Sequence, residues 1–469
     1  MKTDDLRNIP SVSRLLDSPA LQKLVDRIGH HAVVEGVRQR VEALRTRVHQ
    51  ASEAYVPALT ELADQIAESI RRETKPTLLP TINATGILLH TGLGRAPLAA
   101  SAVEAMRAIA SEYASVELDL SSGKRSQRVV AVEPLLQELC GAEAACVVNN
   151  NAGATMLALA AVAAGREVIV SRGQLIEIGG NFRLPDVMAT SGATLREVGT
   201  TNRTHLDDYR RAIHEDTAAL LLVHPSNFVV QGFTKSVELR ELVSLGRECQ
   251  LPVIHDIGSG ALLDMAEYGF RDEPVATESV RQGADLVLFS GDKLLGGPQC
   301  GIAIGRRRWV EQLTQHPMAR ALRVDKLTLA ALAATLRLYR QGDVARREIP
   351  LLAMLSTTED ELEVRARQLA ERINAWHGAV AAEAVADVSY LGGGSIPAQQ
   401  MPTWCVALDA ADENVDRLAA GLRVGTPSVV GRVRRGRLLL DLRSIFPRQD
   451  DALLLAVKQL DVTIEPSGE

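Results

Sequence analysis

Aromatic residues are scarce in this sequence, at 3% of 469 residues. Aliphatic side chains must therefore fill the core, and a site that needs a ring to stack on has few candidates. Long apolar runs are also missing, and the N-terminal residues MKTDDLRNIP lack the apolar segment of a secretory signal. We therefore expect a cytoplasmic protein that makes no membrane contact.

Paired cysteines and an excess of positive charge are absent too. The five cysteines are dispersed, with no CxxC pair and no spacing typical of metal ligands, which favours buried reduced thiols over a disulfide framework or a metal site. A formal net charge of -6 excludes a global attraction to nucleic acid. Any contact with RNA must therefore come from a local basic surface.

The bulk composition is that of a globular protein, with 46% hydrophobic and 23% charged residues. A chain of this length is expected to form two or three domains. Apolar residues recur at helical spacing in the first segment, which predicts a helical domain over residues 1–80. From Thr81 onward, short β-branched runs alternate with helical stretches, as in a parallel sheet with crossover helices. We expect a large α/β domain over 81–325, then a linking helix and a small α+β domain over 326–469.

The pattern also places individual elements. The expected strands are Ala145–Asn149, Glu167–Ser171, Thr194–Val198, Ala219–His224, Val253–Ile257, Leu286–Ser290, Gly301–Gly305, Trp404–Leu408 and Arg437–Leu442. The expected helices include Ala152–Ala164, Val237–Arg247 and Lys326–Tyr339.

Two residues at the ends of neighbouring expected strands carry the strongest chemical signal. Asp256 ends VIHDIG, and Lys293 follows the next strand in LVLFSGDKLLGG. Ligands of doubly wound sheets bind beyond the carboxyl ends of the strands, so both side chains should reach one crevice. A carboxylate for a pyridine nitrogen and a lysine amine for an aldehyde suit pyridoxal 5'-phosphate (PLP). Either residue alone is better explained as a helix cap or a surface lysine, but their order and the following glycines favour PLP.

A phosphate group needs backbone N–H donors at a helix N-terminus. Three successive asparagines lead from the first expected strand into an alanine-rich helix. The small residues Ala152, Gly153 and Ala154 are the predicted phosphate cup, with Thr155 and Ser290 as possible hydroxyl donors. A turn built for helix packing would explain the small residues but not the asparagines.

Longer motifs resemble those of the bacterial selenocysteine synthases, the L-seryl-tRNA(Sec) selenium transferases. The matching segments, in the same order, are INATGILLHTGLGRAPL, SRGQLIEIGGNFRLPDVM, REVGTTNRTHLDDY, HDIGSGALLD, SGDKLLGGPQCGIAIGR and ALRVDKLTLAALAATLRLY. The N-terminal IPSVSRLL is similar as well, so the resemblance covers the chain from end to end.

The resemblance implies a fold-type I PLP transferase, similar to aspartate aminotransferase, with an N-terminal domain that recognises tRNA(Sec). It also implies a homodecamer, a pentamer of dimers. The implied reaction converts L-seryl-tRNA(Sec) to L-selenocysteinyl-tRNA(Sec) for selenoprotein synthesis, through an aminoacrylyl ester on PLP, with selenophosphate as selenium donor. Lys293 and Asp256 are the implied catalytic residues.

Arginines near these motifs need an explanation, because an amino acid esterified to tRNA has no free carboxylate for an arginine to bind. The resemblance associates Arg95, Arg320 and Arg323 with the selenium donor, and Arg128 is a further candidate. Ion pairs at a subunit interface are the alternative. His90, His224 and His255 are candidate proton carriers, and the residue that packs on the PLP ring stays open, with Gln174 as one possibility.

Two other functions are compatible with parts of the pattern. A PLP-dependent lyase or aldolase acting on a small amino or sugar acid would share the core, but it would not need the first eighty residues. A non-catalytic RNA-binding scaffold would not need Asp256 and Lys293.

Overall fold

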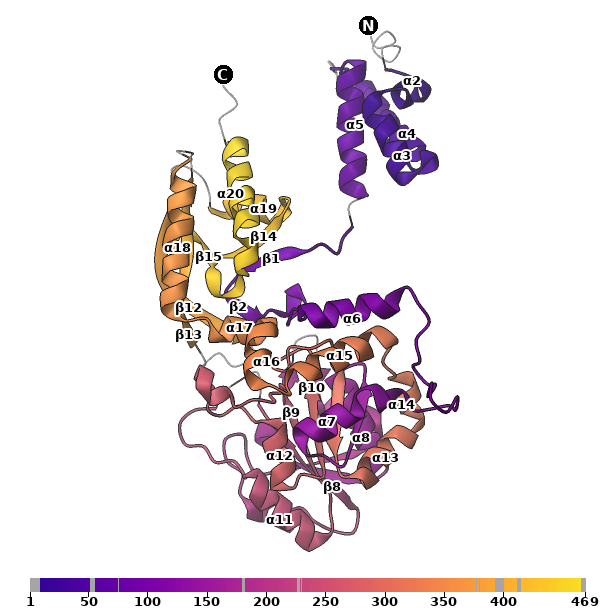
Figure 1. The fold of residues 1–469 in the computed structure, drawn as a ribbon, viewed down its shortest axis with the longest axis vertical. Coiled ribbons are helices and arrows are strands. Elements are labelled where there is room, and N and C mark those ends of the chain that lie inside the picture. The colour runs from indigo at the N-terminus through magenta and orange to yellow at the C-terminus, as the bar shows by residue number, and fades with distance from the viewer. Residues whose placement is uncertain are drawn as a thin grey trace. The chain divides into compact units, whose positions relative to one another are not determined.

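The structure is a computed structural model that describes residues 9–50, 55–74, 76–178, 182–225, 228, 230–376, 378, 380–392, 400–410 and 415–464. The chain divides into two compact units, residues 1–80 and 81–469 (Figure 1). No helix among these described residues is both long and apolar enough to cross a membrane.

The N-terminal unit is helical, with α2 (Val12–Leu16), α3 (Pro19–Ile28), α4 (His30–Gln50) and α5 (Leu59–Glu73). Ser11 caps α2 by accepting a hydrogen bond from the backbone N–H of Arg14, and a proline begins α3. Valines of α4 recur at helical spacing and pack with apolar residues of α3 and α5 into one small core. The prediction of helices in this segment is confirmed.

A seven-stranded sheet organises the rest of the chain. Its order is β3 (Ala144–Val148), β11 (Gly301–Gly305), β10 (Leu286–Ser290), β9 (Val253–Gly258), β8 (Thr217–Val223), β4 (Glu167–Ser171) and β7 (Thr194–Val198). All strands run parallel except β11, which is antiparallel to both of its neighbours. The carboxyl ends of the six parallel strands therefore meet at one edge of the sheet, where ligands of such folds bind.

Helices cover both faces of this sheet, and its strands are almost continuously apolar except the edge strand β7, most of which is exposed. One face packs against α7 (Glu133–Cys140), α11 (Leu239–Cys249), α12 (Ala276–Gln282), α15 (Lys326–Leu338), α16 (Gly342–Glu348) and α17 (Pro350–Ser356). The other face packs against α8 (Asn151–Ala163), α9 (Leu184–Ser191) and α13 (Arg307–Gln315). The remaining helices of this part are α6 (Ala100–Ala110), α10 (Leu206–Ala212) and α14 (Pro317–Ala321). A two-stranded ribbon, β5 (Glu177–Ile178) and β6 (Phe182–Arg183), precedes α9.

A second, six-stranded sheet has the order β1 (Thr81–Ala84), β14 (Ser428–Arg434), β15 (Arg437–Asp441), β13 (Gln400–Ala410), β12 (Val380–Gly392) and β2 (Ile87–Leu89). Three helices supply the apolar side chains that pack on it: α18 (Glu359–Asn374), α19 (Val415–Val424) and α20 (Asp450–Ile464). The strands β1 and β2, which directly follow residue 80, thus pair with strands from the end of the chain. The division of residues 81–469 at position 325 stays a prediction.

The predicted α/β class is confirmed, and all nine expected strands form within a few residues of their expected ends. The strands β1, β2, β5, β6, β12 and β14 were not expected. In β1, β12 and β14 polar or partly exposed residues interrupt the apolar pattern, and β2, β5 and β6 are only two or three residues long, too short for a periodic pattern.

Candidate active site

Lys293 and Asp256 line one cavity of about 250 Å³ at the carboxyl edge of the seven-stranded sheet. Asp256 lies near the end of β9, and Lys293 follows the end of β10, the next strand of the sheet. Of the predicted phosphate cup, Ala152 lines the same cavity, whereas Gly153 and Ala154 are not among its lining residues. Ser290 and the asparagines Asn150 and Asn151 line it as well. The topology thus brings together the residues that the sequence placed at one crevice.

Asp256 is 7% exposed and is held by three donors. The Nδ2 of Asn151 donates to Oδ1 at 2.8 Å, the hydroxyl of Thr155 donates to Oδ2 at 2.8 Å, and the backbone N–H of Gly258 donates to Oδ1 at 3.1 Å. Burial raises the pKa of Asp256, and these hydrogen bonds oppose that rise. A cationic partner in the cavity would favour the ionised carboxylate further.

The amine of Lys293 lies in surroundings that lower its pKa. Burial is the largest cause that lowers its pKa, and the nearby positive charge of Arg95 lowers it further, while the carboxylates around it act in the opposite direction. A lower pKa leaves more of the amine neutral, and the neutral amine is the form that attacks an aldehyde or accepts a proton.

Arg95 lines the same cavity from the segment between β2 and α6. Its Nη1 donates to Oδ2 of Asp292 at 2.8 Å, and Asp292 directly precedes Lys293. The backbone of Arg95 has a φ of 61°, a left-handed conformation that non-glycine residues rarely adopt. Strain of this kind concentrates at functional sites, where surrounding contacts hold it in place.

The N-terminus of α8 forms the predicted cup, and Asn150 caps it. The Oδ1 of Asn150 accepts a hydrogen bond from the N–H of Gly153 at 2.8 Å, and its backbone oxygen accepts from the N–H of Ala154. Among the described residues, no acceptor contacts the N–H of Asn151 or of Ala152, and the Oδ1 of Asn151 is buried without a partner. The two unused N–H donors fit a phosphate-bearing ligand, whereas the unpartnered Oδ1 of Asn151 is an acceptor and would need a donor from elsewhere.

Glycine is required where β11 passes this helix terminus. A Cβ on Gly301 would lie 2.1 Å from the backbone oxygen of Asn150. No side chain fits at that distance, so the antiparallel strand can approach the cup only with glycine at this position.

The apolar walls of the cavity are aliphatic. Ile176 and Leu184, 6% and 1% exposed, line it together with Val223. Gln174 lines an adjoining cavity instead, and its Oε1 accepts a hydrogen bond from the backbone N–H of Val223 at 3.1 Å. Ile176 and Leu184 are thus apolar residues that reach the cavity after β4, and the sequence offered no aromatic signal to find them.

The three histidines have different surroundings. His224, at the end of β8, lines the cavity, whereas His90 and His255 do not. Burial is the main cause that lowers the pKa of His255 to about 3, and the charge of His224 is the second. His255 is therefore neutral at physiological pH. The Nε2 of His224 lies 3.7 Å from Oε2 of Glu273, whose side chain is 0% exposed and has no hydrogen-bond partner among the described residues.

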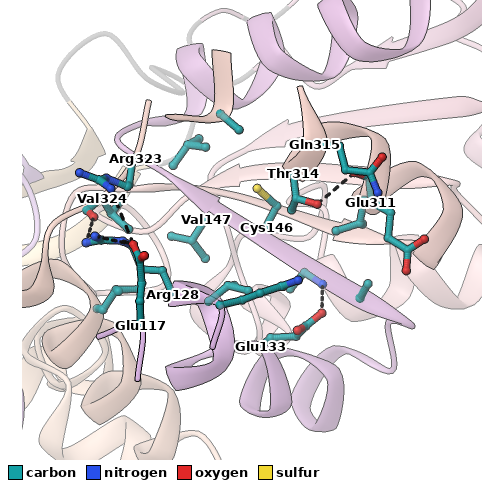
Figure 2. A pocket seen from close by; sticks show the side chains of 18 of the residues that line it. Glu117, Arg128, Glu133, Cys146, Val147, Glu311, Thr314, Gln315, Arg323 and Val324 are labelled. Carbon is teal, nitrogen blue, oxygen red and sulfur yellow. Dashed lines mark hydrogen bonds and ion pairs between the residues drawn. The ribbon is translucent and has the colours of Figure 1, made fainter. Parts of the chain in front are cut away.

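The four predicted donor-binding arginines separate into two places. Arg95 lies in the Lys293 cavity, and the other three line a second cavity of about 540 Å³ beside the edge strand β3. Figure 2 shows Arg128 and Arg323 gathered around Glu117 in this second cavity, where Arg128 donates to Glu117 at 2.9 Å and Arg323 lies 3.7 Å from it. Hydrogen bonds from Arg128 and then Arg125 lower the pKa of Glu117. Arg320 lines the cavity too, and no described carboxylate pairs with it.

The cysteines have no place in this chemistry. Cys300 is fully buried, and burial raises the pKa of its thiol. A cysteine desulfurase would need an accessible, readily ionised thiol near the cofactor.

Comparison with known proteins gives matches over nearly the whole chain. The family model described as L-seryl-tRNA selenium transferase matches residues 81–446, and the model described as selenocysteine synthase N terminal matches residues 6–45. The chain is 46% identical to the L-seryl-tRNA(Sec) selenium transferase of Geobacter sulfurreducens over 96% of this chain and 98% of that protein. It is 45% identical to the enzyme of the same name from Moorella thermoacetica over 97% of this chain and 96% of that protein.

Among solved structures, D-glucosaminate-6-phosphate ammonia-lyase is similar, with a TM-score of 0.57 and 22% sequence identity over 84% of this chain and 98% of that one. Identity at this level shows a shared fold and nothing about the reaction.

Proposed function

This chain belongs to the L-seryl-tRNA selenium transferase family, and from that membership we propose that it converts L-seryl-tRNA(Sec) to L-selenocysteinyl-tRNA(Sec) with PLP as cofactor and selenophosphate as selenium donor. The observation that carries the proposal is the meeting of Lys293 and Asp256 in one cavity at the carboxyl edge of the sheet. A lyase acting on a small amino or sugar acid is not favoured, because the relatives with this name match the N-terminal segment as well as the core.

Lys293 and Asp256 are the proposed catalytic residues. Lys293 would hold the cofactor through its amine, and Asp256 would pair with its pyridine nitrogen. When bound, PLP would supply an electron sink that stabilises negative charge on the α-carbon of the seryl group. The amine of Lys293, when free, would be the base that accepts the α-proton, a role for which its lowered pKa suits it. The three donors around Asp256 keep its carboxylate oriented throughout.

The N-terminus of α8 is the proposed phosphate site. The free N–H of Ala152 is a proposed donor, and that of Gly153 becomes available if the side chain of Asn150 releases it, whereas the N–H of Ala154 donates to the backbone oxygen of Asn150 within the helix. The positive end of the 13-residue helix and the buried hydroxyl of Ser290 add to the attraction for an anion.

Arg95 is the donor-binding residue that the geometry supports best, because selenophosphate has to meet the substrate beside Lys293. The assignment of Arg128, Arg320 and Arg323 to the donor is a proposal from the family resemblance. Their cavity beside β3 offers several guanidinium groups to an anion, with Glu117 as the competing carboxylate.

The helical unit of residues 1–80 is the proposed tRNA-recognition domain. It carries exposed arginines on α4 and α5, which suit contacts with phosphates, and its residues 6–45 match the N-terminal model of the family. We also propose a homodecamer, and a cytoplasmic location, where aminoacyl-tRNA is used.

The test is an absorbance titration of the PLP-loaded protein with seryl-tRNA(Sec), with free serine and with Lys293→Ala as controls. We expect a cofactor band that the variant lacks and that changes with the charged tRNA but not with serine. A band that responds to serine and ignores the tRNA would retain PLP and remove the selenocysteine assignment. Absence of any cofactor band would remove both.

A further inference from the structure

A third cavity, of about 530 Å³, adjoins the Lys293 cavity. His224 lines both, so the two cavities lie on either side of this residue at the end of β8. Residues 200–204, which follow β7, form much of its wall together with Gln231 and residues 234–236. The proposed roles of Lys293, Asp256 and the α8 terminus leave this cavity without a function.

Basic side chains without counter-ions mark this cavity. Arg203, Lys235 and Arg271 line it, and among the described residues no carboxylate forms an ion pair with any of them. The pattern is unusual here, because arginines elsewhere in the described chain commonly pair with a carboxylate within 4 Å. Within the part of the chain that the structure describes, the Nε of Arg203 is buried with no hydrogen-bond partner, and Asp272 is the one acidic residue that lines the cavity. The cavity therefore has positive charge available for an anionic ligand.

An exposed aromatic ring lies against Arg203, one of the lining residues, although the ring itself does not line the cavity. Phe233 is 76% exposed although the chain has few aromatics, and the guanidinium of Arg203 lies over its ring at 3.9 Å from the centroid. An arginine stacked on one face of an exposed ring, beside unpaired cations, is an arrangement that single-stranded nucleic acids bind through their bases and phosphates.

Backbone contacts fix the ring and the cations relative to one another. The Nδ2 of Asn202 donates to the backbone oxygen of Phe233 at 2.6 Å, and the N–H of Lys235 donates to the backbone oxygen of Asn202 at 3.0 Å. The N–H of Thr204 then donates to the backbone oxygen of Lys235 at 2.9 Å. The two segments are tied together before any ligand binds, which reduces the entropy lost on binding.

We propose that this cavity holds the single-stranded 3' end of the aminoacyl-tRNA, with a base stacked on Phe233 and phosphates at Arg203, Lys235 and Arg271. This inference rests on the proposed function, since an amino acid esterified to RNA can reach Lys293 only if the terminal nucleotides occupy space beside its cavity. The shared lining at His224 supplies that connection.

The test measures fluorescence anisotropy of a 5'-labelled ribonucleotide, GCCA, with the full-length PLP-loaded protein. We expect Arg203→Ala and Phe233→Ala each to weaken binding about 10-fold, in line with losses for base-stacking residues. Phe233→Tyr should retain binding, because it keeps a ring. Arg340→Ala is the matched control, since Arg340 is half exposed, pairs with Glu138 and lies outside the cavity.

Kinetics separate this inference from the proposed function. The two weakening variants should raise KM for seryl-tRNA about 10-fold and leave kcat and the bound cofactor's absorbance band unchanged. Variants with wild-type RNA affinity and KM would overturn the inference while the reaction itself stands. If the wild-type protein binds GCCA more tightly than Phe233→Ala does but leaves seryl-tRNA unconverted, the inference is upheld and the proposed function is contradicted.

Discussion

The hydroxyl of Thr155 allows a sharp test of how Asp256 is held. Its Oγ1 lies 2.8 Å from Oδ2 of Asp256, and the residue is 1% exposed. Thr155→Val keeps nearly the same shape and removes the hydroxyl alone. Thr155→Ser keeps the hydroxyl and removes a methyl group, so the pair separates the hydrogen bond from the packing.

The expected effect follows from the charge of the acceptor. A hydrogen bond to an ionised group contributes about 1.5–3 kcal/mol, roughly 10- to 150-fold in a binding constant. We expect Thr155→Val to weaken PLP binding by a factor in this range, because the cofactor's ring nitrogen needs the ionised Asp256. Thr155→Ser should stay within a few-fold of wild type.

The pH dependence has a definite sign. Burial already raises the pKa of Asp256, and the hydrogen bond from Thr155 lowers it. Removing that bond raises the pKa further, so the carboxylate is protonated at a higher pH on acidification. The loss of PLP affinity at low pH should therefore begin at a higher pH in Thr155→Val than in wild type.

The assay is a titration of the cofactor-free protein with PLP, followed by absorbance over a range of pH. Equal dissociation constants and equal pH midpoints for the valine and serine variants would refute the reasoning. They would mean that Asn151 and the N–H of Gly258 alone hold the carboxylate.

Three further perturbations test other parts of the structure. Gly301→Ala places a Cβ 2.1 Å from the backbone oxygen of Asn150. We expect the free energy of unfolding, measured by denaturant titration, to fall by about 1–3 kcal/mol or more. An unchanged unfolding midpoint would show that β11 can shift to make room. Arg95→Ala removes a positive charge that lowers the pKa of the neighbouring lysine, so the pH profile for covalent attachment of PLP should move to higher pH, and an unmoved profile would contradict this. Glu273→Gln removes a buried carboxylate without a hydrogen-bond partner, so we expect the free energy of unfolding at pH 8 to rise by about 1–3 kcal/mol; a fall would show that the carboxylate is paired with its neighbouring histidine.

The sequence predicts the central sheet well, because strands covered on both faces are uniformly apolar and end in small or polar residues. Asp256 and Lys293 could be placed in one crevice for the same reason, since the ends of neighbouring parallel strands must lie together. Their roles at the site remain predictions that the proposed experiments test.

Other features had no local signal. Ile176 resembles any aliphatic residue after a strand, and only the fold shows that it reaches the cavity. Glu273 lies in a loop between a 3-10 turn and α12, where a carboxylate normally faces solvent, and its burial depends on tertiary packing. The short strands β1 and β2 take their partners from the far end of the chain, a pairing that no local pattern encodes.

The strand order of the two sheets also has a consequence for synthesis on the ribosome. β3 is made first in the large sheet, yet its neighbour is β11, the last strand of that sheet to be made. The partners of β1 and β2 in the second sheet, β14 and β12, are synthesised later still. Both sheets therefore close through contacts of high contact order, which form slowly and leave strand edges exposed in the meantime. A nascent chain of this protein should depend on chaperones until residues beyond β14 have emerged, whereas the helices of residues 1–80 need no partner from later in the chain.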